Sequence, residues 1–344
     1  MNPYALSMII SSLALGTITT LSSYHWILAW IGLEINTLAI IPLMTKTPHP
    51  RSIEATTKYF LTQAAASALI LFSCTINAWL LGEWTINNLM NPSSTILLSI
   101  AISTKLGLAP FHFWIPEVLQ GLTLQTGWIL STWQKLAPMA ILLQLSQSIN
   151  LTLMLIIGFL SILIGGWGGI NQSQIRKILA FSSVAHLGWM IIILKFSPQL
   201  SLLNFILYII MTSTLFYMFI IVNSTNISQL STTWSKIPAL TALSLLSLLS
   251  LSGLPPLTGF LPKWLIAQEL IKQDLTLLSF IILMLTLLSL FFYLRLTYTI
   301  SLTMAPAPSF SFSLWLLKKK NNLTFPLLLT LCLLPISPSL LHLV

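Results

Sequence analysis

Four charged side chains stand inside long apolar segments of the sequence: Glu34, Lys105, Lys135 and Lys263. A charge at the centre of a membrane helix costs about 2.5–3.5 kcal/mol on insertion scales, so each one needs a partner, a water-filled cavity or a function. Burial in a low-dielectric medium also disfavours the charged form of an ionisable group. Lysines in such surroundings, with a carboxylate in reach, could take up and release protons as the local field changes.

Two histidines, His112 and His186, lie in the same kind of segment and add titratable groups. The alternative interpretation of all six residues is structural, with buried ion pairs that hold helices together. One glutamate cannot balance three lysines, so pairing alone does not satisfy the buried charge. We therefore predict that Glu34 and the three lysines move protons, with the two histidines in a secondary role.

The stretch that follows Lys105 is typical of an interrupted helix, and it recurs downstream. Residues 107–116 (GLAPFHFWIP) match residues 253–262 (GLPPLTGFLP), and Lys263 follows the second copy directly. Proline removes a backbone hydrogen-bond donor and glycine loosens a helix. Carbonyls freed in this way at membrane depth are tolerated only against protein or water. Two interrupted helices, each beside a lysine, predict two related halves, as in ion carriers.

The composition excludes an ordinary soluble protein. Of 344 residues, 56% are hydrophobic and 6% are charged, whereas a soluble domain is about 25% charged. The net charge of +9 is scattered along the chain; in a membrane protein such charges set orientation, so we expect no nucleic-acid partner. The two cysteines, Cys74 and Cys332, have neither metal-ligand nor disulfide spacing.

The apolar segments predict an all-α polytopic membrane protein with about eleven transmembrane helices, since each span needs about 20 residues. The predicted spans are 3–21, 25–44, 58–81, 94–116 (broken), 123–145, 149–170, 175–194, 201–222, 237–271 (broken), 276–300 and 323–341. The broken spans stand five helices apart, and a repeat of five spans reverses its direction across the bilayer. We therefore expect two inverted five-helix repeats with broken helices. They would form a single domain over 1–344, with repeats at about 1–145 and 149–300 and a C-terminal helix at about 323–341.

Basic residues in the predicted loops indicate the orientation. With the N-terminus inside, the outside loops would carry only Lys195 and Lys272, beside three acidic residues. An odd number of spans then places the C-terminus outside. The inside loops and helix ends would carry the other basic residues, which are Lys46, Arg51, Lys58, Arg176, Lys177, Lys236, Arg295 and Lys318 to Lys320.

At residues 105–117 (KLGLAPFHFWIPE) the chain resembles the antiporter-like subunits of respiratory complex I and of multisubunit cation/proton antiporters. The opening MNP, residues 133–138 (WQKLAP) and residues 253–264 (GLPPLTGFLPKW) extend the likeness over the whole chain. The resemblance implies an antiporter-like transmembrane domain in which Glu34 pairs with Lys105 and Lys135 bridges towards Lys263. His112 and His186 would join a hydrated polar axis.

The resemblance also implies a location and partners. The chain would be a core membrane-arm subunit of NADH:ubiquinone oxidoreductase in the mitochondrial inner membrane, moving protons from the matrix to the intermembrane space. Its partners would be other complex I subunits, including neighbouring antiporter-like ones, and membrane lipids. NADH, FMN, iron–sulfur clusters and ubiquinone would bind other subunits, because this sequence has neither cluster-binding cysteine spacing nor a dinucleotide fingerprint.

Two alternatives stay open at this point. A free-standing cation/proton antiporter would use the same buried charges, and sodium-driven proton exchange by the isolated chain would identify it. A structural spacer of the membrane arm would need the charges for assembly but not for proton pumping.

Overall fold

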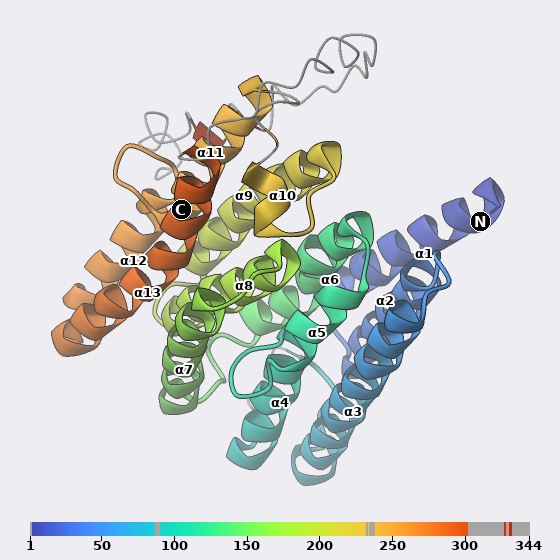
Figure 1. Ribbon diagram of the computed structural model, residues 1–344. Helices are drawn as coiled ribbons and strands as arrows, with labels where there is room; N and C mark the ends of the chain where they lie inside the picture. Colours follow the sequence, from blue (N-terminus) through green and yellow to red (C-terminus); the bar gives the residue numbers. More distant parts are fainter. Residues whose placement is uncertain are drawn as a thin grey trace. The chain divides into compact units, whose positions relative to one another are not determined.

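The computed structural model describes residues 2–86, 90–231, 233, 238–301, 327, 330 and 331. All the elements named in this part of the chain are helices (Figure 1). They are α1 (Pro3–Ser22), α2 (Trp26–Met44), α3 (Pro50–Leu81), α4 (Pro92–Leu106), α5 (Trp114–Gly121), α6 (Leu124–Gln144), α7 (Leu151–Ile170), α8 (Ile175–Ile193), α9 (Pro198–Val222), α10 (Ile227–Ser231), α11 (Pro238–Ser252), α12 (Phe260–Lys272) and α13 (Thr276–Ser301).

The predicted all-α membrane fold is confirmed. Within the described residues, seven helices are long and apolar enough to cross a membrane: α1, α2, α3, α7, α8, α9 and α13. The predicted spans at 123–145 and at the two broken positions correspond to α6, to α4 with α5, and to α11 with α12. The predicted C-terminal helix at 323–341 lies outside the described residues, apart from Leu327, Thr330 and Leu331.

Two details of the prediction were wrong. Helix α3 begins at Pro50, not at residue 58, and α10 was not predicted. The charges of Arg51, Glu54 and Lys58 end the apolar run, but the helix extends through them because His49 caps it. The His49 side chain accepts a hydrogen bond from the Arg51 backbone N–H, and Pro50 at the first helical position supplies a suitable φ angle.

Both predicted helix breaks are confirmed, and they have the same local construction. Gly107 directly follows α4 with φ 72°, and Gly253 directly follows α11 with φ 85°. Positive φ angles favour glycine because it has no Cβ. In both places the next helix, α5 or α12, starts seven residues after the glycine.

The chain packs into two compact units. Unit 1 comprises residues 1–161 and 190–198, and unit 2 comprises residues 162–189 and 199–344. Each unit contains one broken helix pair, α4–α5 in unit 1 and α11–α12 in unit 2. The bounds of the two repeats and their inverted relation stay predictions.

Helices α1 and α2 pack with their backbones in contact in unit 1. A Cβ built on Gly32 would lie 2.5 Å from Thr19 Oγ1 and 2.9 Å from the backbone oxygen of Gly16. A Cβ on Gly16 would meet Asn36 Oδ1 at 2.5 Å. Small residues at such crossings let membrane helices approach closely. This contact positions α2, which carries Glu34.

We predict that Gly32→Ala lowers the free energy of unfolding by about 1–3 kcal/mol, because the methyl group overpacks this crossing. The measurement is the midpoint of thermal unfolding in detergent micelles. Leu28→Ala is the matched control, since Leu28 lies one turn earlier on α2 and is 55% exposed. Equal midpoints for the two variants would contradict the backbone contact.

Candidate functional site

Lys105 and Lys135 line one small cavity inside unit 1, although they lie on different helices. Lys105 is on α4 and Lys135 on α6, and they are 5% and 4% exposed. The volume of the cavity is about 20 Å³, which is enough to hold one water molecule. Its other lining residues include Tyr59, Gln63 and Trp114. The structure therefore brings together two of the three predicted lysines.

Lys105 occupies the last turn of α4, two residues before Gly107, which caps the helix. Partial negative charge at a helix C-terminus favours a cation there. Gln63 on α3 donates from Nε2 to the Lys105 carbonyl at 3.4 Å, and Trp114 donates from Nε1 to the Thr104 carbonyl at 3.1 Å. The ammonium nitrogen of Lys105 is buried and has no hydrogen-bond partner in the described part of the chain. The amine is thus held at a polar helix end without a direct bond to an acid.

Glu34 on α2 acts on this site through its charge. The carboxylate interacts electrostatically with Lys105 and with the Tyr59 hydroxyl. Its Oε2 atom is buried and lacks a hydrogen-bond partner among the described residues. The predicted Glu34–Lys105 relation is therefore an electrostatic one, in which the ammonium donates no hydrogen bond to Oε2.

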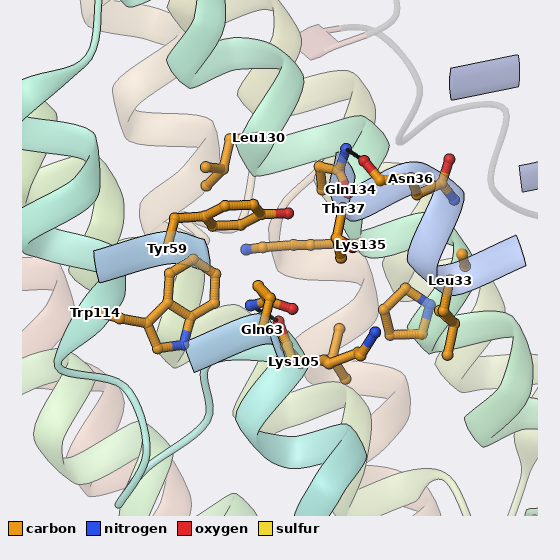
Figure 2. Close-up of a pocket in the computed structure, with 13 residues that line it drawn as sticks. Leu33, Asn36, Thr37, Tyr59, Gln63, Lys105, Trp114, Leu130, Gln134 and Lys135 are labelled. Carbon is orange, nitrogen blue, oxygen red and sulfur yellow. Dashed lines mark hydrogen bonds between the residues drawn. The ribbon is translucent and has the colours of Figure 1, made fainter. Parts of the chain in front are cut away.

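Lys135 extends into the cavity from α6, and Figure 2 shows its side chain beside Tyr59. Three residues later, Pro138 lies inside the same helix and cannot donate to the carbonyl of Gln134. The Gln134 side chain donates from Nε2 to the Asn36 carbonyl at 3.0 Å, which ties α6 to α2. This contact holds the helix that carries Lys135 against the helix that carries Glu34.

Sequence reasoning missed the neutral polar residues of the cavity. Tyr59 is 2% exposed and packs edge-on against Trp114, with ring centroids 5.7 Å apart. Gln63 is 4% exposed and faces the same space. The available signal was an amide side chain in the middle of an apolar span, since a buried polar group needs a partner.

Lys263 and His186 line a second cavity, which lies within unit 2. Ser289 and Tyr293 also line this cavity. Its volume is about 10 Å³, which is the lower limit for one water molecule. Lys263 donates from Nζ to the carbonyl of Ser252, the last residue of α11, at 2.7 Å. Its side chain crosses Gly253, where a Cβ would lie 2.9 Å from Lys263 Nζ. The second break therefore also holds a lysine at a helix C-terminus, and this lysine is half-buried.

The structure places the two histidines differently. His186 joins Lys263 in the unit 2 cavity, and its ring lies 5.7 Å from that of Tyr208. His112 is buried in the break between α4 and α5, with its ring 4.3 Å from that of Phe113. His112 does not line the cavity of Lys105 and Lys135. Its predicted place on a polar axis stays a prediction.

Two family models together match almost the whole chain. Residues 23–289 match the model described as "NADH:quinone oxidoreductase/Mrp antiporter, TM". Residues 290–341 match the model described as "NADH dehydrogenase subunit 2 C-terminus".

Individual proteins give the same result. The chain is 64% identical to NADH-ubiquinone oxidoreductase chain 2 of Aquarana catesbeiana over 289 residues, 84% of each chain. It is 55% identical to the chain of that name from Polypterus ornatipinnis over 342 residues, 99% of each chain. A chain in the structure of respiratory complex I from Thermus thermophilus with bound aureothin superposes with a TM-score of 0.86 and 26% identity, covering 98% of this chain and 79% of that one. The chain therefore belongs to the NADH-ubiquinone oxidoreductase chain 2 family, whose antiporter-like membrane fold was expected from its lysine-bearing helix breaks.

Proposed function

We propose that the chain is a proton-translocating core subunit of the membrane arm of NADH:ubiquinone oxidoreductase. The observation that carries this proposal is the unit 1 cavity, where Lys105 and Lys135 share a space large enough for water beside the charge of Glu34. The names of its relatives supply the enzyme to which it would belong. In that enzyme the chain would be part of an H⁺-translocating reductase without doing redox chemistry itself.

The charge of Glu34 would decide when Lys105 holds its proton. Two opposite unit charges about 4 Å apart interact by about 4 kcal/mol at an effective dielectric constant of about 20. That energy changes a protonation equilibrium about a thousandfold. When Glu34 approaches, the lysine keeps its proton, and when Glu34 moves away, the proton can leave. Small movements of α2 against α4 would therefore be enough to switch Lys105.

Water in the cavity would carry the released proton to Lys135. The Tyr59 hydroxyl and the Gln63 amide can donate and accept hydrogen bonds, so they could orient that water between the two amines. In unit 2, Lys263 and His186 would form a second proton-holding site around their own cavity. His112 would have a secondary role in proton translocation, from its position in the break between α4 and α5.

The proposed setting is the mitochondrial inner membrane, with other subunits of the complex as partners. Those partners would include neighbouring antiporter-like chains and membrane lipids, without nucleic acid. The redox cofactors NADH, FMN, iron–sulfur clusters and ubiquinone would bind elsewhere in the complex, which agrees with the spacing of Cys74 and Cys332.

The N-terminus would face the matrix and the C-terminus the intermembrane space, with proton transfer in the same direction. A C-terminal tag should accordingly be cleaved by a protease added to intact mitoplasts. Cleavage only after the inner membrane is permeabilised would reverse this orientation.

We predict that Lys105→Met in the assembled complex lowers proton pumping about tenfold or more, because a positioned proton-transfer group contributes about 10²–10⁴-fold in rate. Lys263→Met should also lower proton pumping. The measurement is the proton gradient formed by proteoliposomes during NADH oxidation, corrected for the amount of assembled complex.

Lys272→Met is the control for these two variants. Its side chain is 63% exposed and lies 3.4 Å from Glu269, outside both cavities. Pumping by Lys105→Met at the level of Lys272→Met would refute the role of Lys105. Reduced assembly with unchanged pumping per complex would favour the structural spacer.

Native electrophoresis of gently solubilised membranes separates the proposal from a free-standing antiporter. We predict that the chain migrates with rotenone-sensitive NADH dehydrogenase activity, because relatives that are 64% and 55% identical to it carry the name of that enzyme. Migration alone, or in a small assembly without that activity, would make cation/proton exchange the activity to assay.

A further inference from the structure

An open apolar groove runs along α3 beside the first helix break, and no lysine among the described residues lines it. Its volume is about 450 Å³, within the range of about 300–1,000 Å³ of ligand pockets. Ala65 and Leu69 line it from α3, and Phe111 and Phe113 line it from the break. Phe113 is 70% exposed. An apolar groove of this size on a membrane-spanning unit can accept a hydrocarbon chain.

The α3 wall of the groove continues into a charged end. Lys58, Thr62, Ala65 and Leu69 follow one another at intervals of four, three and four residues, which places them on one face of the helix. Lys58 is the last charged residue before the apolar run of α3. The distance along the helix from Lys58 to Leu69 is about 16 Å. That length matches about half of the 30 Å hydrocarbon core, the depth of a single leaflet.

The opposite wall reaches the same charged end. Trp114 lines the groove from α5, and Glu117 stands three residues later on that helix. Lys58 Nζ lies 2.6 Å from Glu117 Oε2 and 2.6 Å from Glu54 Oε1. Arg51 acts electrostatically on Glu54. Two cations and two carboxylates therefore lie beyond the Thr62 end of the groove.

We propose that this groove binds one phospholipid with an ethanolamine headgroup. Its acyl chain lies against Ala65, Leu69 and the two phenylalanines. Its phosphate accepts hydrogen bonds from Lys58 and Arg51, as phosphates do from lysine and arginine. Its ammonium donates to Glu54 and Glu117, which can only accept when they are ionised. A choline headgroup has no N–H to donate, and a purely anionic headgroup would face two carboxylates.

The test is photolabelling of the purified complex with two lipids that carry the same diazirine-bearing acyl chain. One has an ethanolamine headgroup and the other a choline headgroup. Labelled peptides are identified by mass spectrometry. We expect the ethanolamine lipid to label residues 62–69 and 110–114, and excess unlabelled phosphatidylethanolamine to compete for this site.

Two alanines of α3 provide matched variants. Both Ala65 and Ala68 are exposed, but only Ala65 lines the groove. Ala65→Trp should reduce the labelling about tenfold, because the indole occupies the volume of the acyl chain and builds a clash against the ligand. Ala68→Trp should leave the labelling unchanged. Glu117→Gln should reduce the preference for ethanolamine over choline.

Three results would overturn the proposal. Equal labelling by the ethanolamine and choline lipids would remove the headgroup assignment. Equal labelling of Ala65→Trp and Ala68→Trp would place the lipid elsewhere. Absence of label from this segment in the unmodified complex would mean that another polypeptide or a second copy covers the groove. None of these measurements depends on proton pumping, so their outcomes are independent of the proposed proton translocation.

Discussion

The electrostatic attraction between a lysine and the C-terminal end of a broken helix is the interaction on which the rest of this structure depends. Lys263 donates to the last carbonyl of α11, and Lys105 stands in the last turn of α4. The partial negative charge at a helix C-terminus, about half an elementary charge, stabilises a cation without neutralising it. A lysine held in this way can be buried and still exchange its proton. A full ion pair with a carboxylate would instead fix the charge.

Both units have a lysine at the C-terminal end of a broken helix, but different residues surround it. In unit 1 the cavity joins two lysines from α4 and α6, with the Glu34 charge nearby. In unit 2 one lysine shares its cavity with a histidine and a tyrosine. The position three residues into the helix after the break is Glu117 in α5 and Lys263 in α12. The same backbone position therefore carries an exposed ion pair to Lys58 in one unit and a half-buried lysine that donates to a helix end in the other.

The sequence was sufficient to predict the helices and the breaks, because apolar length and Gly-Pro placement act locally. It also identified Lys105 and Lys135 as buried, since they interrupt apolar runs, whereas Lys263 is half-buried. It could not predict that α3 starts at Pro50, because the His49 cap competes with three charges that otherwise mark a loop. It could not predict which lysines share a cavity, or that Tyr59 and Gln63 face it, because those neighbours come from distant segments and depend on helix rotation. Comparison with relatives then assigned the family.

Proton transfer between Lys105 and Lys135 requires water in the unit 1 cavity that connects them. The most direct measurement is a cryo-electron microscopy map of the assembled complex at a resolution that shows ordered water. We expect at least one water within hydrogen-bond distance of the Lys105 ammonium, in the space lined by Lys135 and Tyr59. A dry cavity, with Lys105 bonded only to protein atoms, would contradict it.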